Sequence, residues 1–157
     1  MDPTEVLTEW LHGIRIDHVT HSRAAAWCTR MGRILGIPVV VFAVVVGTTI
    51  FATLTESPNV SLRVAAGLLS MLAAVLSGVQ TFLDYSGRAQ QHHQAAVGYS
   101  RLRKEVEEFL SFDSQPDDQK QFMQETRAKW DALKESSLDV SQAIYDKASL
   151  MTRRKGH

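Results

Sequence analysis

Two long hydrophobic runs that contain no charged residue constrain this chain more than any other feature. The first runs from Ile34 to Thr55 and the second from Val64 to Leu83, so only eight residues separate them. At about 1.5 Å per helical residue, each run can cross the roughly 30 Å hydrocarbon layer of a bilayer as a helix. Core helices of soluble proteins usually show a polar stripe, and these runs carry no charge on any side. We therefore predict a membrane hairpin over residues 34–83.

The polar flanks on either side of this hairpin are electrically balanced. Four basic and four acidic residues precede Ile34, and twelve of each follow from Asp84 onward. Because a broad nucleic-acid interface usually needs an excess of Lys and Arg, we expect no nucleic-acid partner. The first run starts too late and is too long for a secretory signal peptide, so we expect the chain to keep both helices.

The basic residues nearest the spans predict the orientation of the chain in the membrane. Four precede the first span and four follow the second, whereas the connecting loop from Glu56 to Arg63 holds one; they are Arg15, Arg23, Arg30, Arg33, Arg88, Arg101, Arg103, Lys104 and, in the loop, Arg63. Lys and Arg collect on the cytoplasmic side of membrane helices. We therefore expect an inner-membrane protein with both termini in the cytoplasm.

The segment before the first span, residues 1–33, reads as an amphipathic helix that continues into the membrane. Asp2, Pro3 and Glu5 form a helix start signal. A mostly apolar stripe with spacings of three and four follows, namely Val6, Trp10, Ile14, Asp17, His21, Ala24, Cys28 and Met31. Pro38 removes one backbone donor, which predicts a bend near the membrane boundary.

The segment after the second span, residues 84–157, predicts a cytoplasmic helical hairpin. Its first stripe continues the span as one long helix to about Phe112 and comprises Tyr85, Ala89, His92, Ala96, Tyr99, Leu102 or Arg103, Val106, and Phe109 or Leu110. The turn signal from Asp113 to Pro116 ends this helix. A second stripe predicts one further helix through Phe122, Thr126, Trp130, Leu133, Ser137, Val140, Ile144, Ala148 and Met151. The expected fold is all-α, a two-span hairpin with long cytoplasmic amphipathic helices that form a bundle.

Rows of small residues inside the spans are candidates for helix association. Ala66, Ser70, Ala74 and Gly78 lie four apart on the second span, and Ala43 and Gly47 do so on the first. Such rows let helix backbones approach closely in lipid. Either both rows join the two helices of one hairpin, or one row joins the hairpin and the other joins neighbouring protomers in a homo-oligomer.

Polar residues at membrane depth are the candidates for a pore wall. They are Ser70, Ser77, Gln80 and Thr81, all on the second span. Polar side chains within a bilayer prefer protein contacts or water. The spans hold no Asp, Glu, Lys, Arg or His, so a proton relay or an ion pump lacks its usual parts.

Catalytic and metal-binding patterns are weak in this sequence. His18 and His21 share a helix face and His92 is followed by His93, but neither spacing matches a recognised metal-ligand set, and interhelical or solvated histidines are the simpler interpretation. Cys28 has no evident general base, and no glycine-rich phosphate loop is present. We expect no enzyme activity, no metal and no cofactor.

The helix that leaves the second span carries residues that point to a family. Phe82-Leu83-Asp84-Tyr85, Arg88-Ala89, His92-His93, Ala96, Tyr99 and Leu102-Arg103-Lys104-Glu105, behind a two-span hairpin with a short loop, resemble the SLATT family. These are two-span effector domains of bacterial conflict systems. The resemblance implies an antiphage membrane effector that answers a nucleotide-derived or other infection signal by oligomerising into a pore, and so causes abortive infection.

The same resemblance implies partners and a place for the signal. A nucleotide second messenger, or a separate sensor or synthase protein, would act on the cytoplasmic helices. The candidate signal-receiving residues are His92, His93, Tyr99, Arg101, Arg103 and Lys104. The three basic residues have a simpler interpretation as a solvated face, because Glu105, Glu107 and Glu108 follow each by four positions. The alternative function is a non-enzymatic adaptor whose hairpin is only an anchor and whose cytoplasmic helices recruit a partner.

Overall fold

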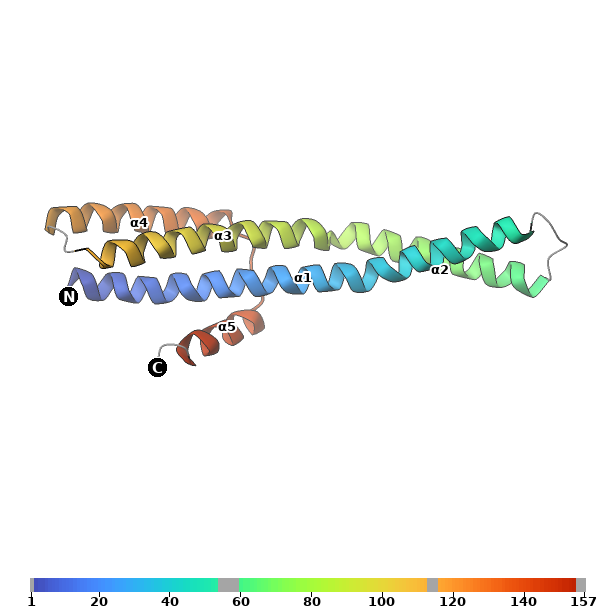
Figure 1. Cartoon of the computed structure of the whole chain (residues 1–157), viewed down its shortest axis with the longest axis horizontal. Coiled ribbons are helices and arrows are strands. Elements are labelled where there is room, and N and C mark those ends of the chain that lie inside the picture. The colour runs from blue at the N-terminus through green and yellow to red at the C-terminus, as the bar shows by residue number, and fades with distance from the viewer. Residues whose placement is uncertain (1, 54–59, 113–115, 155–157) are drawn as a thin grey trace. The chain divides into compact units, whose positions relative to one another are not determined.

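The computed structural model describes residues 2–53, 60–112 and 116–154, and every regular element within them is a helix. The five helices are α1 (Pro3–Thr53), α2 (Val60–Leu83), α3 (Tyr85–Leu110), α4 (Pro116–Ser136) and α5 (Gln142–Arg154), as Figure 1 shows. The predicted all-α fold is therefore confirmed. The chain divides into two compact units, the membrane hairpin (residues 28–87) and the helical bundle (residues 1–27 and 88–157).

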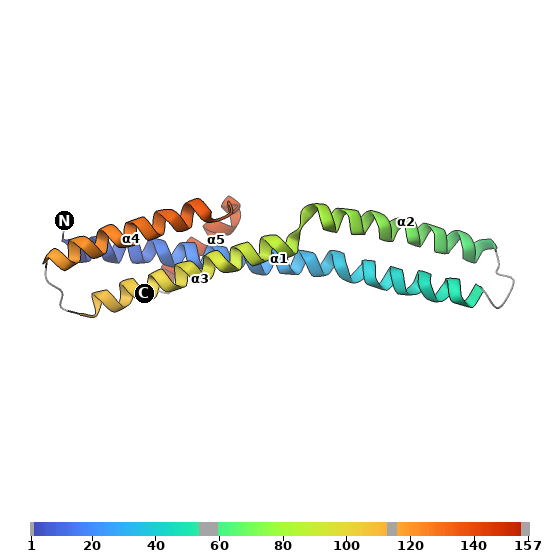
Figure 2. The same cartoon turned by 90° about the horizontal axis from the view of Figure 1, so that it is seen from above.

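The membrane hairpin consists of the second half of α1 and all of α2, which run side by side (Figure 2). The most apolar 18-residue windows have mean hydropathies of 2.2 and 1.9, and none of their residues is buried. Large side chains such as Val40 and Leu68 are more than 60% exposed. Water would solvate such a surface poorly, whereas lipid matches it. The first half of the loop predicted from Glu56 to Arg63 lies outside the described residues. The second half was wrong, because α2 begins at Val60, four residues before the predicted start.

Asp84 interrupts the helix that the sequence predicted to run unbroken from the second span to Phe112. Its φ of 39° lies in the left-handed region, which Asp tolerates better than most residues. The Asp84 carboxylate then accepts a hydrogen bond from the backbone N–H of Gly87, with an N···O distance of 3.0 Å. Asp84 thus ends α2 and caps the first turn of α3, and the prediction of one continuous helix was wrong here.

The helical bundle is built on an antiparallel pair, α3 and α4, as predicted from the short linker between them (Figures 1 and 2). The rings of Phe109 and Phe122 stack with centroids 3.9 Å apart near the turn. Further along, Lys129 donates to Glu105 at 2.7 Å. The turn residues 113–115 lie outside the described residues.

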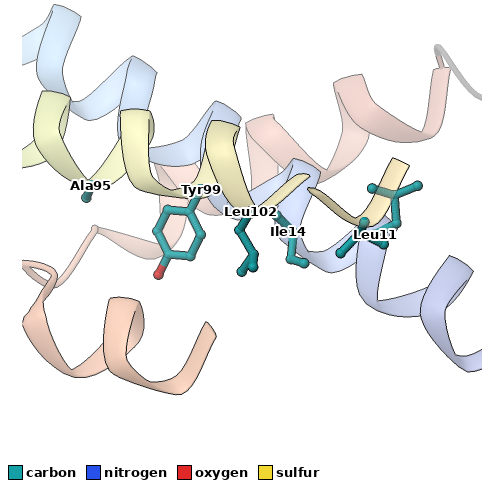
Figure 3. Packing of buried hydrophobic residues seen from close by; sticks show 6 residues of the cluster. Leu11, Ile14, Ala95, Tyr99 and Leu102 are labelled. Carbon is teal, nitrogen blue, oxygen red and sulfur yellow. The ribbon is translucent and has the colours of Figure 1, made fainter. Parts of the chain in front are cut away.

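The first half of α1 completes the core of the bundle. Figure 3 shows side chains of α1 and α3 that pack together, and the whole buried cluster comprises Leu11, Ile14, Ala95, Tyr99, Leu102 and Val106. The predicted stripe of α3 is confirmed by the burial of His92, Ala96, Tyr99, Leu102 and Val106. On α1 the predicted stripe is confirmed by the burial of Ile14, His21, Ala24 and Cys28. It is displaced only at its start, where Leu7 and Leu11 are buried while Val6 and Trp10 are half-buried.

The single helix predicted through residues 116–151 was wrong, because α4 ends at Ser136 and α5 begins at Gln142. The hydroxyls of Ser136 and Ser137 donate to backbone carbonyls of the last turn, those of Ala132 and Leu133. Serine hydroxyls of this kind compete with continued helix formation. Beyond the break, α5 keeps part of the predicted stripe, with Ala148 fully buried.

Candidate functional site

One face of α2 packs against α1, and we call this contact surface between the two helices the seam of the membrane hairpin. Its half-buried residues recur every three or four positions and are Ala66, Leu69, Ala73, Leu76, Gln80 and Leu83. The opposing half-buried residues of α1 include Leu35, Gly36, Val39, Phe42 and Val46. Complementary large and small side chains give the two helices their packing in lipid, where no hydrophobic effect drives association.

A second face of α2 carries small and hydroxyl side chains that are exposed. This outward small face consists of Gly67, Ser70, Ala74, Ser77, Gly78 and Thr81. A side chain placed on Gly67 or Gly78 would meet nothing within 4 Å. The hydroxyl of Thr81 donates a hydrogen bond to the backbone carbonyl of Ser77 at 3.0 Å, so this donor already has a partner within the helix. Five of the predicted interface or pore residues, Ser70, Ala74, Ser77, Gly78 and Thr81, therefore share this surface with Gly67.

The third face of α2 is exposed and carries large apolar side chains from Leu68 to Val79. Leu68, Leu72, Val75 and Val79 are 40% to 64% exposed. Their rough surface suits acyl chains, whereas the outward small face offers a flat strip to another helix. Three different surfaces on one helix thus separate hairpin packing, lipid contact and a small exposed strip, of which Gly67 and Ser70 also line a groove shared with α1.

Gln80 lies apart from the other predicted pore residues. It is half-buried in the seam, and a Cβ on Gly36 would come within 3.2 Å of its amide nitrogen. The amide therefore packs on the α1 backbone, while Ser70 and Ser77 face outward. Of the remaining predicted interface residues, Ala66 lies in the seam, Ala43 is exposed, and Gly47 has open space around its Cβ position.

In the bundle, only part of the predicted signal-receiving set comes together. His92 and Tyr99 are buried against α1, where the Nδ1 atoms of His92 and His21 lie 3.1 Å apart and the Tyr99 ring stacks on His21. His93, Arg101 and Lys104 are exposed. Arg103 is half-buried and pairs with Glu107 at 3.6 Å, the ion pair expected from their spacing. Glu105 instead binds Lys129 of α4.

Burial sets the protonation of the histidine pair. Burial first, and the charge of His92 second, lower the pKa of His21 from 6.5 to about 4. The pKa of His92 is lowered as well, by burial and by Arg88. Both rings are therefore neutral at pH 7, and their short contact requires one Nδ1 to donate and the other to accept. Tyr99 stays protonated, since burial raises its pKa.

Asp17 and Trp130 form a polar contact that the sequence did not predict. Trp130 Nε1 donates to Asp17 Oδ2 at 2.8 Å and links α4 to α1. Burial raises the pKa of Asp17, although the Trp130 bond and the charge of Lys134 act in the opposite direction. The sequence feature that could have predicted this contact is Asp17 itself, an acidic residue in an otherwise mostly apolar stripe.

A cavity of about 580 Å³ between α1, α3 and α5 was also missed. Its polar lining consists mainly of His12, Arg15, His18, Arg23, Arg103 and Glu107. Arg103 alone was among the predicted signal-receiving residues. The other basic residues were assigned to membrane orientation, and nothing in a linear pattern showed that α5 would fold over them. Within the described residues, no group of three His, Cys, Asp or Glu side chains could hold a metal ion.

An all-α membrane protein with a two-helix hairpin and a separate helical bundle is the class that these features define. The sequence model of the SMODS and SLOG-associating 2TM effector domain family 4 matches residues 6–155, so the chain belongs to this family. The predicted SLATT membership is confirmed, and with it a role as a two-transmembrane effector of bacterial conflict systems. Searches among curated proteins and among solved structures each found no match.

Proposed function

We propose that this protein disrupts the bacterial inner membrane during antiphage defence, by assembling into a homo-oligomeric pore in response to an infection signal. The observation that carries this proposal is the outward small face of α2. It is exposed in the single chain, flat enough for close helix approach, and bears Ser70 and Ser77. Hydroxyls at membrane depth gain from water or a protein partner, and a ring of protomers supplies both.

The division of α2 into faces supports a pore more than a simple anchor. An anchor needs only a seam and a lipid-facing surface, and α2 has both without using Ala74, Ser77 or Gly78. A ring of these residues and Ser70 from several chains would surround a narrow polar lumen, whose hydroxyls would keep water in place. In this arrangement both termini are cytoplasmic, and the helical bundle receives the signal directly or through a separate sensor protein.

The test is a dye-based measurement of membrane potential in bacteria that express the full chain with its defence partners and are infected by a phage that the system restricts. Wild-type cells should depolarise. The double variant Ser70→Leu with Ser77→Leu should not, because its lumen would be dry, while Leu remains favourable in lipid. Gln80 is left unchanged because it packs in the seam.

The matched control is Val75→Leu with Val79→Leu, which changes two exposed residues on the lipid-facing side of the same helix. It should depolarise the membrane as the wild type does. An unchanged potential in infected wild-type cells would remove the pore and leave the adaptor function. Full depolarisation by the serine double variant would remove the outward small face as the pore wall.

A further inference from the structure

The cavity between α1, α3 and α5 is strongly basic for its size. Three guanidinium groups, Arg15, Arg23 and Arg103, face a single carboxylate, Glu107, which leaves a formal excess of two positive charges. His12 and His18 add two further polar rings. Like charges gathered around one hollow repel each other, so this arrangement is costly unless an anion occupies it.

The guanidinium groups in this cavity have N–H donors for which the described residues provide no hydrogen-bond acceptor. Glu107 accepts a hydrogen bond from Arg15 Nη2 at 2.7 Å, but its oxygen lies 3.6 Å from Arg103 Nε, too far for a hydrogen bond. Arg103 Nε is buried and has no hydrogen-bond partner in the described structure. A buried donor left in this state costs free energy that a bound acceptor would recover.

Arg23 also has only a weak hydrogen-bond acceptor among the described residues. Its Nη2 donates to the sulfur of Met151 on α5, a contact of 2.6 Å, and it makes no ion pair within the described residues. A thioether is a weak acceptor, and guanidinium groups prefer carboxylate or phosphate oxygens. The Met151 sulfur thus stands beside the Arg23 guanidinium at a position that an anion would occupy more favourably.

We propose that this cavity binds an organic phosphate with at least two negative charges, held by Arg15, Arg23 and Arg103. A phosphate group presents three oxygens to donors from different directions and so can meet two helices at once, which a planar carboxylate does less well. The cavity volume falls within the usual range of small-molecule sites and exceeds what inorganic phosphate fills. Val19 and Met151 supply apolar surface for the rest of the ligand.

Such a site would give the bundle a direct means of sensing. The ligand would join α1 and α3 to α5, whose Met151 and Thr152 line the cavity. This regulatory role rests on the proposed function, because it makes the ligand the signal that opens a pore. Binding itself does not depend on pore formation and can be measured separately.

The experiment is isothermal titration calorimetry on the full-length protein in a neutral detergent. ATP and inorganic tripolyphosphate are the charged probes, and adenosine is the uncharged control. ATP and tripolyphosphate should bind and adenosine should not. Arg23→Gln and Arg103→Gln should each weaken ATP binding at least tenfold, whereas Arg127→Gln, an exposed arginine of α4 with its own ion pair, should leave it unchanged.

Glu107→Gln distinguishes lost folding from lost binding. It breaks the Arg15 ion pair, as an arginine substitution would, yet it should strengthen ATP binding several-fold because it removes the only acid from the lining. Repeating the titration in nanodiscs of phosphatidylcholine, with or without phosphatidic acid, whose phosphomonoester can carry two negative charges, separates the two sources of phosphate. Equal ATP affinity in both discs assigns a soluble ligand, and loss of ATP binding only with phosphatidic acid assigns a lipid headgroup.

Absence of binding by both charged probes at millimolar concentration would overturn the proposal, as would equal weakening by Arg127→Gln and Arg23→Gln. The binding and depolarisation measurements distinguish failure of the ligand site from failure of the proposed pore function. Binding without depolarisation of infected cells would remove the pore and keep the site. Depolarisation that requires Ser70 and Ser77 but is unaffected by Arg23→Gln would keep the pore and remove the ligand as its signal.

Discussion

His21 is the side chain of α1 whose burial has the clearest consequence for single-residue chemistry. It is 7% exposed, contacts His92, and lies under the ring of Tyr99. Burial keeps it neutral, because a positive charge on this ring would be held away from water. A single proton on the pair still leaves one donor and one acceptor, so the hydrogen bond between α1 and α3 is lost only when both rings are charged.

We expect the bundle to lose stability as the pH falls from about 6.5 to about 4. The pKa of His21 is about 4 in the folded state and 6.5 in the unfolded chain, so the unfolded state binds more protons in this window. Stability is then fully present above pH 6.5 and is lost on acidification, by at most about 3 kcal/mol for a shift of this size. Thermal unfolding of the full chain in detergent at a series of pH values measures it.

The control for this prediction is His21→Gln, which cannot gain a proton and should flatten the pH profile. Asp17 acts in the opposite direction at the acid end, because burial raises its pKa. The difference between the two proteins isolates the histidine. Identical slopes for wild type and variant between pH 6.5 and pH 4 would show that His21 does not titrate on unfolding.

Gly13 should not tolerate even one added methyl group. A Cβ there would lie 2.8 Å from Cη2 of Trp130, a rigid ring that is also held by Asp17. We expect Gly13→Ala to cost about 1 to 3 kcal/mol in spite of the higher helix propensity of Ala. Gly98→Ala is the matched control, since its Cβ would meet only the flexible end of Leu133. Thermal unfolding that ranks Gly98→Ala as equally destabilising would contradict this reading of the contact.

At the scale of whole elements, α2 is informative because its three faces have different compositions. The seam mixes large and small residues, the lipid-facing side is uniformly large, and the outward small face is uniformly small. Sequence spacing predicted that Ser70, Ala74 and Gly78 share a side. It could not say whether that side meets α1 or another protomer, because both helices carry small residues at spacings of four.

Assembly should depend on the outward small face. Gly78→Leu places a bulky side chain where helix backbones would approach, and lost packing of this kind costs on the order of 1 to 3 kcal/mol. We expect the purified variant to dissociate in nanodiscs at protein concentrations where the wild type stays oligomeric, as measured by mass photometry. Val79→Leu, the neighbouring residue on the lipid-facing side, should behave as wild type. A wild-type oligomer in Gly78→Leu protein would move the interface elsewhere.

At the scale of the whole molecule, we expect both termini on the cytoplasmic side. The four, one, four distribution of nearby basic residues favours this orientation. Reporters fused after Leu11 and after His157 should both report the cytoplasm, and a tag at Asn59 should be accessible from outside. The adaptor and pore functions share this topology. Termini on opposite faces would overturn the assignment of two spans.

The sequence by itself determined the membrane hairpin, the all-α class and the family. Each of these depends on local composition and on the spacing of residues along one helix. Such patterns can be recognised without knowing which helices pack against each other. The stripe on α3 was predicted for the same reason, and its members His92, Tyr99 and Val106 are buried.

Only the tertiary structure decided which residues meet across helices. The breaks at Asp84 and after Ser136 depend on single side chains that bond the backbone, which periodicity does not register. The pairing of His21 with His92 and of Asp17 with Trp130 joins positions 71 and 113 residues apart. The basic cavity arises because α5 folds back over α1 and α3, so arginines that are unremarkable along the chain become neighbours around one hollow.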